Sequence, residues 1–541
     1  MVRILKKNHS LNVLCFIAIV CLETLFFKNI LFTDQLIGGA IDGRLNNYFM
    51  EHWYRVFSGI EKWTEQNCFY PITGVAGYSD LMLGFGIPYS LCRWIGLDMY
   101  LSYNFILVCT HVVGSLFLFR FMRIYIKVNH ISALLSVVVF SYSNMYFLVT
   151  DTPQMFALSY MPISMCAIAK YMNTKRDSLS RHVWMLIGIS ILSLSFYTAF
   201  YVGYMVCLWM GFFVLIFLLY GFLVKKNQCW VVDIFHEMRH RMIELGVYLI
   251  VFMLSLIPFV YLYMPQLKNS GGRTWEEVML FLPTWKGMFM QEEAFSFDPV
   301  TVGKINVHIG FPVVAYVIFV ILVILGFKKV RDQQKKYFYM KLLLLVLVVT
   351  FPLSFRVEEY SLWYFIYKYI PGASGIRGVL RWEFILTLPI SILMGMCAGN
   401  MSIHKPTLRY IICGCFVVVV FVANFSLMGI DATWNRKEEI AFLDSVPTPP
   451  KDCEVFFVIT NEEDKVRNEG SYQMDAWAIA NKYKLHTING YSGMEPKDWA
   501  VKIYVEDVKK EALWWMNDNN LSISSMYMYN LSSHEWLKVD L

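Results

Sequence analysis

The sequence predicts a polytopic all-helical membrane bundle with a small α/β domain at its C-terminal end. Three observations lead to this fold class. The 541 residues are 57% hydrophobic and 17% aromatic, and only 16% are charged. Apolar stretches long enough to cross a bilayer, which takes about 20 residues, recur along most of the chain. After about residue 431 the apolar runs shorten to strand length, as in CEVFFVIT over 453–460.

About eleven membrane-spanning helices are expected. The first apolar stretch follows Arg3, Lys6 and Lys7, as in a secretory signal, but it is long enough to span and no A-x-A cleavage site follows it. We therefore expect it to remain as the first helix. The expected spans are 11–33, 100–126, 131–149, 154–172, 183–200, 202–224, 246–264, 308–327, 339–355, 383–401 and 410–430.

Basic residues gather in alternate connecting segments, which indicates the cytoplasmic side. These segments carry Lys127, Lys175 to Arg181, Lys225 to Arg241, Lys328 to Lys336, and Lys405 with Arg409. The opposite segments carry acidic residues instead, from Asp34 and Asp42 to Glu358 and Glu359. We therefore predict a multi-pass protein of the cell (plasma or inner) membrane, with a cytoplasmic N-terminus and an extracytoplasmic C-terminus.

Two domains are expected: the membrane region, 1–430, and the extracytoplasmic α/β domain, 431–541. Within the first, the outer segments 34–99, 265–307 and 356–382 are too long to be simple connections. The apolar run after Tyr78 is interrupted by Gly84, Gly86 and Pro88. Irregular backbone at membrane depth needs a protein or cavity lining, so a re-entrant or interfacial element is expected there, with Asp80 at its mouth.

The stretch 41–55, IDGRLNNYFMEHWYR, concentrates charge just after the first span. Its apolar residues recur at helical spacing, which is typical of an amphipathic helix on a membrane surface. The polar face would meet water or a polar substrate, so Arg44, Glu51 and His52 are candidate substrate-binding residues. Asp42 stands where the helix would begin. It is either an N-terminal cap or the catalytic carboxylate of a membrane enzyme, with Asp80 as the second candidate.

Further charges are expected on the same side of the membrane, at Asp151, His308, Arg377 and Arg381. Asp151 in TDTP could also be a cap or turn former, and His308 could simply begin a span. Arg377 and Arg381 are four residues apart, so they would share one helix face. They could extend toward lipid head groups or hold a phosphate by charge-assisted hydrogen bonds.

The motif search excludes several classes of enzyme. The sequence has no P-loop, no GxGxxG, no HExxH and no GxSxG. No Cys pair or Cys/His cluster indicates a zinc site, so no metal and no cofactor is predicted; a divalent metal is conceivable but lacks a DxD-type motif. Aromatic outer residues such as Trp53, Tyr54 and Trp63 could stack on sugars or form an interfacial belt. No nucleic-acid partner is expected.

The arrangement resembles the GT-C glycosyltransferases: an acidic residue after the first span, an interfacial helix, many spans and an extracytoplasmic C-terminal domain. IDGRLNNYFMEHWYR, SDLMLGFGIPYSL and PGASGIRGVLRW look most like the bacterial YfhO-like branch and its relatives. The resemblance covers 11–430 and implies that Asp42 matches the loop carboxylate and that Arg377 and Arg381 match a donor-phosphate site. The first loop departs from the family pattern, since it lacks a DxD or ExD pair. NGYSG (489–493) and DAW (475–477) also look like segments of such proteins.

The resemblance implies transfer of a sugar from a polyprenyl-phosphate carrier to an envelope glycan, lipid or polymer at the outer face of the membrane. The partners would be that donor, the acceptor and the lipid bilayer. The alternative is a flippase or exporter of a lipid-linked sugar or polysaccharide. A transporter would place charges along a pathway at mid-membrane, whereas the charges here collect outside the spans, which favours an enzyme.

Overall fold

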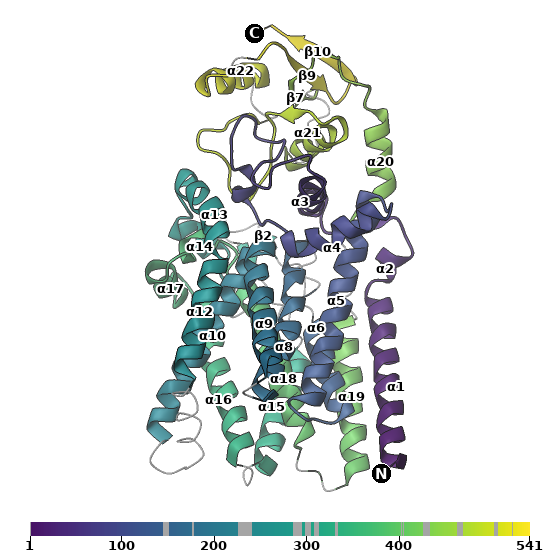
Figure 1. Cartoon of the computed structure of the whole chain (residues 1–541), viewed down its shortest axis with the longest axis vertical. Coiled ribbons are helices and arrows are strands. Elements are labelled where there is room, and N and C mark those ends of the chain that lie inside the picture. The colour runs from purple at the N-terminus through teal and green to yellow at the C-terminus, as the bar shows by residue number, and fades with distance from the viewer. Residues whose placement is uncertain are drawn as a thin grey trace.

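We describe a computed structural model of the chain, in which a long helical bundle carries a smaller region of sheet and helices at one end (Figure 1). The two termini lie at opposite ends of the long axis. The structure describes residues 2–143, 146, 151–175, 178–224, 241–284, 295–297, 305–307, 313–330, 334–401, 403, 405–425, 433–461, 469–502, 507–521 and 523–540.

The bundle is built around α18 (Arg381–Gly399), which contacts helices on several sides and is buried along nearly its whole length. Its run of apolar side chains is typical of a helix surrounded by other helices. The helices arranged with it are α1 (Val2–Phe26), α5 (Met99–Ile124), α6 (His130–Ser141), α8 (Met161–Asn173), α9 (Leu179–Thr198), α10 (Phe200–Val224), α12 (Met242–Ser255), α13 (Ile257–Ser270), α15 (Val313–Val330), α16 (Gln334–Thr350) and α19 (Pro406–Phe425).

Five helices in the described part of the chain are long and apolar enough to cross a membrane. They are Met99–Ile124, Leu179–Thr198, Phe200–Tyr220, Lys336–Ser354 and Arg381–Gly399, and the bent pair α12 and α13 would make a sixth. Four further apolar helices are shorter: Ser10–Phe26, His130–Ser141, Val314–Lys328 and Thr407–Ala423. The membrane character expected from the sequence is therefore supported, whereas the number eleven stays a prediction.

Several expected spans differ from continuous α-helices, three of them clearly. The stretch 154–172 consists of a 3₁₀ segment, η2 (Pro153–Tyr160), followed by α8. The stretch 246–264 bends by 48° between α12 and α13, where Pro258 removes a backbone donor at the start of the second helix. The span expected at 131–149 is represented by α6, and its last residues, like 308–312 and 426–430 of two other spans, fall outside the described residues.

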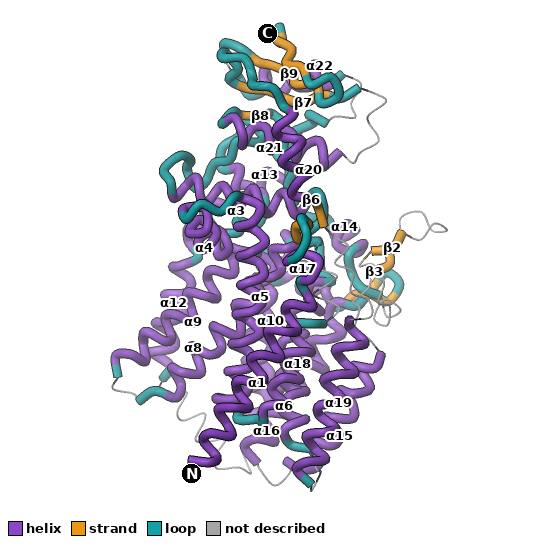
Figure 2. The backbone as a smooth tube through the Cα atoms, turned by 90° about the vertical axis from the view of Figure 1, so that its right-hand side faces the viewer, coloured by secondary structure: helices purple, strands orange, loops and turns teal. Residues whose placement is uncertain are grey.

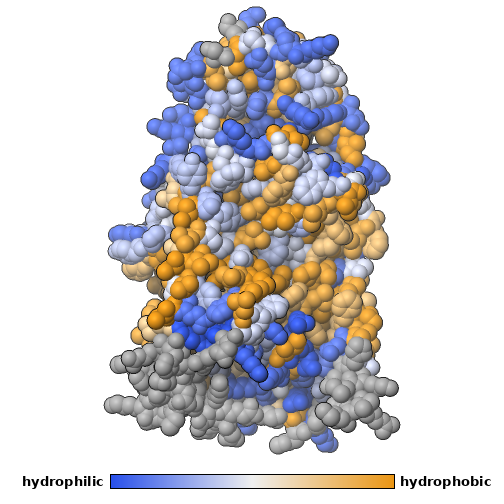
Figure 3. Space-filling model, viewed as in Figure 1, coloured by the Kyte–Doolittle hydropathy of each residue, from blue (hydrophilic) through white to orange (hydrophobic). Residues whose placement is uncertain are grey.

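The hydropathy of the surface separates an apolar bundle from a polar end. On the face shown in Figure 3, hydrophobic residues form a broad band around the bundle, and hydrophilic residues dominate the end that carries the C-terminus. Large apolar side chains such as Ile250 (59% exposed) and Tyr261 (72% exposed) point outward from α12 and α13. In a protein that spans a bilayer, such side chains meet lipid tails.

Short elements form a layer across the C-terminal end of the bundle. They include α2 (Lys28–Leu31), β1 (Gln35–Ile37), α3 (Asp42–Phe57), η1 (Val75–Tyr78), α4 (Leu83–Trp94), α14 (Trp275–Leu280), α17 (Trp363–Tyr369) and η5 (Ala373–Gly375). The segment between α16 and α17 adds η4 (Phe351–Ser354) and the paired strands β4 (Arg356–Val357) and β5 (Tyr360–Ser361). In the outer segment 265–307, β2 (Phe295–Phe297) pairs with β3 (Ile305–Val307), and much of the rest lies outside the described residues.

Residues 433–540, which we call the C-terminal region, begin in this layer and extend beyond it (Figure 2). A four-stranded sheet has the order β10-β9-β7-β8, with parallel β8–β7 and β7–β9 pairs and an antiparallel β9–β10 pair. The elements are β6 (Thr433–Asn435), α20 (Arg436–Ser445), β7 (Val455–Ile459), α21 (Glu469–Tyr483), β8 (His486–Thr487), α22 (Val508–Asp518), β9 (Met526–Asn530) and β10 (Glu535–Val539). Strand β7 is apolar on both faces, as expected for a strand in the middle of a covered sheet.

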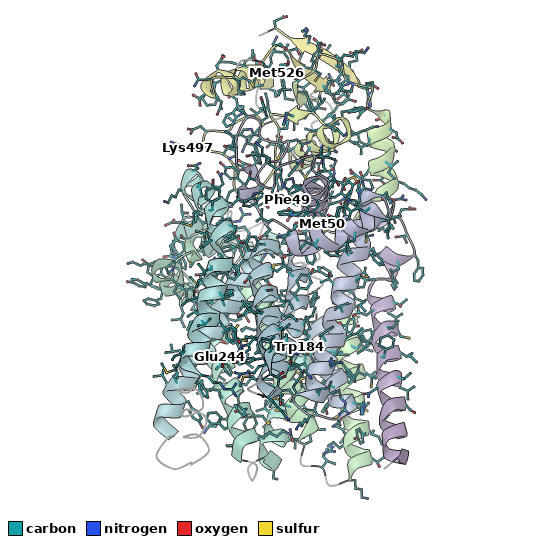
Figure 4. The ribbon with its side chains drawn as sticks, in the orientation of Figure 1. Phe49, Met50, Trp184, Glu244, Lys497 and Met526 are labelled. Atoms are coloured by element: carbon teal, nitrogen blue, oxygen red, sulfur yellow. The ribbon has the colours of Figure 1, made fainter. Side chains whose placement is uncertain are left out.

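The first and last parts of the chain meet at the junction. Strand β1 pairs antiparallel with β6, so that Leu36 lies opposite Trp434. Helix α3 lies between the bundle and the C-terminal region, where Phe49 and Met50 (labelled in Figure 4) are 2% and 0% exposed. The polar face predicted to meet water instead contacts α21, because the C-terminal region covers it.

Candidate active site

Five charged residues from four separate parts of the chain interact at the end of the bundle that carries the C-terminal region. Asp42 is the first residue of α3, Asp80 precedes α4, and Asp151 precedes η2. Arg377 lies in the loop before α18, and Arg381 is the first residue of that helix. The charges of the other four all act on the carboxyl group of Asp42. The sequence separates these residues by more than 300 positions, and only the fold brings them together.

Two neighbouring glycines, Gly38 and Gly39, bring the segment that carries Asp42 close to the segment that carries Asp151. Gly38, just after β1, has a φ of +100°, which only glycine adopts readily. A side chain at the next residue, Gly39, would place its Cβ 2.3 Å from Oδ1 of Asp151. The amide of Gly39 donates a hydrogen bond to that carboxylate. The glycine pair before α3 therefore lets the two acidic segments approach each other.

The carboxyl group of Asp42 is more basic than an ordinary aspartate. Burial is the main cause, and it raises the pKa of Asp42 to about 6 with the help of Asp151 and Asp80. The guanidinium groups of Arg381 and Arg377 oppose this rise by stabilising the ionised form. A carboxylate with such a pKa is ionised at neutral pH and accepts a proton more readily than an exposed aspartate does, as a general base requires.

The other two carboxylates are held by hydrogen bonds. Oδ1 of Asp80 accepts from the amide of Phe200, at 2.7 Å, and Asp80 also bonds the side chain of Gln154. Desolvation raises the pKa of Asp80 and that of Asp151, although Arg381 lowers both. Asp80 is thus fixed against the start of α10, whereas Asp42 is the first residue of α3 and Ile41 occupies the N-cap position of that helix.

Tyr201 contacts both Arg377 and Arg381. Its ring centre lies 4.5 Å from Cζ of Arg381, a cation–π contact. Its hydroxyl accepts a hydrogen bond from the backbone amide of Arg377, at 3.1 Å. Arg377 also lies 3.6 Å from Glu277 and 4.9 Å from the ring centre of Phe281. The expectation that both arginines share one helix face was wrong, since Arg377 precedes the helix, yet both act on Asp42.

A loop of the C-terminal region completes the cluster. The segment NGYSG places Tyr491 close enough for Asp42, Arg377 and Asp151 to influence its hydroxyl, and burial raises the pKa of Tyr491 to about 12. Ser492 donates to the carbonyl of Tyr78, at 2.8 Å, and Arg273 donates to the carbonyl of Gly493. This loop is therefore tied to two outer segments of the bundle, with a protonated phenol beside the charges.

Three of the predicted substrate-binding residues lie elsewhere and have protein partners. Arg44, 1% exposed, is 2.7 Å from Asp475 and 3.2 Å from Glu439. These contacts attach α3 to α20 and α21 of the C-terminal region, so they give Arg44 a structural role.

Glu51 and His52 are also engaged within the protein. Glu51 is 2.9 Å from Arg93 and accepts from the hydroxyl of Tyr89, at 2.6 Å. His52 Nδ1 is 2.9 Å from Glu61, and the other ring nitrogen is 3.3 Å from the carbonyl of Trp63. Neither residue belongs to the cluster around Asp42. Their polar groups stabilise the fold of the first outer segment.

Several members of the cluster were not singled out as site residues from the sequence. Asp151 in TDTP is also typical of a cap or turn former, and Tyr201 belongs to an apolar stretch without a motif. Tyr491 lies in NGYSG, whose glycines and asparagine were the one available signal. His308, also weighed as a candidate, lies outside the described residues.

The cluster combines a basic carboxylate with two guanidinium groups. In the described part of the chain, no group of three or more Asp, Glu, His or Cys side chains is placed to hold a metal ion. The chemistry available to the site is proton acceptance by Asp42 and charge-assisted binding of an anion by Arg377 and Arg381. A hydroxyl group bound here could give its proton to Asp42, and a phosphate bound beside it could contact the two arginines.

Comparison with known proteins was informative only at the level of the fold. No protein-family model matches the sequence, and no curated protein matches it significantly. The chain is similar in structure to the oligosaccharyltransferase of Archaeoglobus fulgidus, tethered with an acceptor peptide, with a TM-score of 0.50 and 11% identity over 95% of this chain and 68% of that one. A second structure of that enzyme, with zinc and sulfate, has a TM-score of 0.47 and 12% identity over the same shares. The first similarity supports a GT-C-like fold.

Proposed function

We propose that this protein is a membrane glycosyltransferase that moves a hexosyl or pentosyl group from a polyprenyl-phosphate carrier to a glycan, lipid or polymer acceptor at the outer face of the membrane. The observation that carries the proposal is the convergence of Asp42, Arg377 and Arg381 at one end of an apolar bundle. A lipid-phosphate sugar places its phosphate at that level, because its hydrocarbon chain stays in the bilayer. The donor phosphate and the catalytic carboxylate can then meet at the membrane surface.

Each group has a defined part in the transfer. Asp42 takes the proton of the acceptor hydroxyl as its oxygen attacks the anomeric carbon of the donor sugar. The bond between that carbon and the phosphate oxygen breaks, and its electron pair leaves with the phosphate. Arg377 and Arg381 stabilise the negative charge on the departing group. Asp80, which is hydrogen-bonded to Phe200, is assigned to positioning, and it remains the second candidate for the base.

The fold agrees with this chemistry. The solved structure to which the chain is similar is an oligosaccharyltransferase, and its acceptor is a peptide. At 11% identity this similarity carries over the fold alone, so the donor and the acceptor of the present protein rest on the charges of its own site. We place Asp42 and the C-terminal region on the extracytoplasmic side, as the distribution of lysine and arginine indicates.

We propose that the two guanidinium groups neutralise the donor phosphate without a resident metal ion. Arg381 acts on all three carboxylates of the cluster, and Arg377 acts on Asp42. The site therefore contains its own cations. Transfer by purified protein should persist after treatment with EDTA, whereas full inhibition that Mn²⁺ or Mg²⁺ reverses would overturn this part of the proposal.

The rival function, a flippase or exporter of a lipid-linked glycan, has one observation in its favour. Glu23 and His111 form a buried pair between α1 and α5, with Nδ1 of His111 2.8 Å from the carboxylate. Ser115 also donates to Glu23, at 2.7 Å. Ionisable groups inside a bundle can mark an ion pathway. Here they contact each other, and the cluster with two arginines lies at the end of the bundle.

Glycan mass comparison separates the two functions. Envelope glycans from cells with and without the gene would be compared by mass spectrometry, alongside an extract of the lipid-linked intermediates. A transferase predicts loss of a single sugar mass from the envelope glycan, and Asp42→Asn should reproduce that loss. Accumulation of a complete lipid-linked glycan in the cytoplasmic leaflet would instead identify a transporter.

A further inference from the structure

A second site is indicated by a cavity that shares no residue with the cluster around Asp42. The cavity has a volume of about 490 Å³ and lies between the second half of α3, the start of α5, and helices α20 and α21. We call it the α3–α20 cavity. Figure 1 shows α20 on one side of α3, and α14, which provides Glu277 to Arg377, on the other. Its volume is within the range of small-molecule sites, about 300–1,000 Å³.

Aromatic side chains form part of its wall. Tyr48 and Tyr100 are 2% and 3% exposed, and Tyr54 lies beside them in the lining. The guanidinium of Arg93 lies 4.9 Å from the ring centre of Tyr54, which holds that ring in place. Aromatic faces beside planar polar groups suit a sugar, because a sugar ring has an apolar face and a rim of hydroxyl groups.

The charges of the cavity are largely paired with one another. Arg93 is 2.9 Å from Glu51, and Lys482 is 3.5 Å from Asp444. Arg55, also in the lining, is 3.0 Å from Glu61. Because carboxylates already neutralise these cations, an anionic ligand would gain little here. A neutral ligand with many hydroxyl groups could hydrogen-bond to both members of the Arg93–Glu51 pair and of the Lys482–Asp444 pair, which line the cavity.

Three buried polar atoms on lining residues have no hydrogen-bond partner in the described structure. They are the hydroxyls of Tyr48 and Tyr100 and Nδ2 of Asn481. Oδ1 of Asn481 accepts from Arg55, at 2.7 Å, and from Asn67, at 3.2 Å, so this amide is fixed with its nitrogen still to be satisfied. Buried polar groups are nearly always hydrogen-bonded. A ligand that reaches these atoms from the cavity would supply the missing partners.

We propose that the α3–α20 cavity binds a neutral segment of a glycan, separately from the charged cluster. The tyrosine rings contact the apolar face of a sugar ring, and the paired charges bind the rest of its rim. The hydroxyl of Tyr100 donates to or accepts from a sugar hydroxyl, and Nδ2 of Asn481 donates to one. The segment belongs either to the acceptor glycan or to a donor that carries more than one sugar. The distinction between acceptor and donor rests on the proposed function. The binding of a glycan does not, because it does not require catalysis.

Saturation-transfer NMR on the full-length protein in nanodiscs tests the proposal. The probes are neutral di-, tri- and tetrasaccharides of glucose, galactose, mannose and N-acetylglucosamine, with inorganic phosphate and phosphatidylglycerol vesicles as anionic comparisons. Tyr100→Phe removes one hydroxyl, and Asn481→Asp keeps the oxygen that accepts from Arg55 and Asn67 while it removes the nitrogen. Tyr529→Phe, a loss of one hydroxyl on β9 outside the cavity, is the matched control.

We expect saturable binding of at least one neutral oligosaccharide, weakened roughly threefold to tenfold by Tyr100→Phe or by Asn481→Asp. Tyr529→Phe and Asp42→Asn should leave it unchanged. Binding that survives in Asp42→Asn would hold even if the proposed transfer reaction failed. The absence of binding across the panel, equal binding in Tyr100→Phe and Asn481→Asp, or a preference for phosphate or phosphatidylglycerol would overturn the proposal.

The source of the glycan follows from kinetics in the same variants. If the cavity holds the acceptor, Tyr100→Phe should raise KM for the acceptor and leave KM for the donor unchanged. If it holds the donor glycan, the pattern should be reversed. Either split supports a glycan site, whereas unchanged values of both constants would argue against one.

Discussion

The guanidinium of Arg381 lies over the ring of Tyr201, with Cζ 4.5 Å from the ring centre. The same tyrosine accepts a hydrogen bond from the amide of Arg377. Tyr201 therefore contacts the cation of Arg381, at the first residue of a helix, and fixes the backbone of Arg377 in the loop before it. This arrangement depends on the planar shape of the guanidinium group, which stacks on an aromatic ring and presents paired donors to a phosphate.

Replacement of both arginines by lysine should weaken binding of the donor. Arg377→Lys combined with Arg381→Lys keeps the charge but removes the planar, bidentate contact with phosphate. We expect the dissociation constant for a polyprenyl-phosphate sugar to rise at least tenfold while the thermal stability stays close to that of the parent. Isothermal titration calorimetry of the protein in nanodiscs measures this dissociation constant. Arg356→Lys, at a residue outside the cluster, is the control, and an unchanged donor affinity would refute the phosphate assignment.

Asp42→Asn should abolish transfer without weakening the fold. Asparagine cannot accept the proton of the acceptor, so turnover should fall on the order of 10²-fold or more. The structure also gives the sign of the stability change. The pKa of Asp42 is raised in the folded state, so its stabilising effect is present at low pH and is lost as pH rises through about 6.

At pH 7 the buried Asp42 is ionised, and its unfavourable desolvation lowers the stability of the folded parent. The asparagine variant carries no charge there and should be more stable than the parent, by up to about 3 kcal/mol. At pH 4 the difference should nearly vanish. Thermal unfolding at the two pH values and a transfer assay measure the two effects. Retention of near-parental turnover would end the catalytic assignment and make Asp80 the next residue to test.

The pH dependence of transfer should report the ionisation of Asp42. A general base acts when it is deprotonated, so turnover should rise through a pH of about 6 and level off above it. The charge of Arg381 lowers the pKa of Asp42, and Arg381→Gln removes that charge. The rise should therefore move to higher pH in this variant, in a profile measured at saturating donor. A shift to lower pH would contradict the electrostatic arrangement.

The buried pair Arg44–Asp475 should be essential for attachment of the C-terminal region. Arg44→Met leaves the carboxylate of Asp475 buried without its partner, which typically costs about 3–5 kcal/mol. Arg44→Met with Asp475→Leu removes both charges and should recover part of that loss. Limited proteolysis would report detachment of the C-terminal region, and thermal unfolding would measure the stability of both variants. If the single variant were as stable as the parent, Arg44 would be free for the substrate role first predicted for it.

Cysteine labelling should place the C-terminal region outside the cell. Asn517 on α22 and Lys328 on α15 are both exposed, and they belong to opposite ends of the molecule. In a background without other reactive thiols, an impermeant maleimide should modify Asn517→Cys in intact cells. Lys328→Cys should react only after lysis, because lysine and arginine concentrate on its side. The reverse pattern would invert the predicted topology.

The sequence by itself determined the class of molecule and most of its candidate chemistry. A bilayer requires long apolar helices, so composition and hydropathy were enough to predict a membrane bundle. The change of pattern after about residue 431 was enough to predict strands. Asp42, Asp80, Arg377 and Arg381 were identifiable because charge is scarce in this chain and stands out against apolar sequence.

Only the tertiary structure decided which charges act together. Arg44 and Asp42 are two residues apart, yet Arg44 is buried against Asp475 and Asp42 interacts electrostatically with Arg381. Helical spacing separates side chains by face, but it does not reveal what covers each face. Here α21 covers the polar face of α3, and the loop with Tyr491 reaches the cluster from a distant part of the chain. Contacts between residues so far apart depend on packing in three dimensions, which local periodicity does not encode.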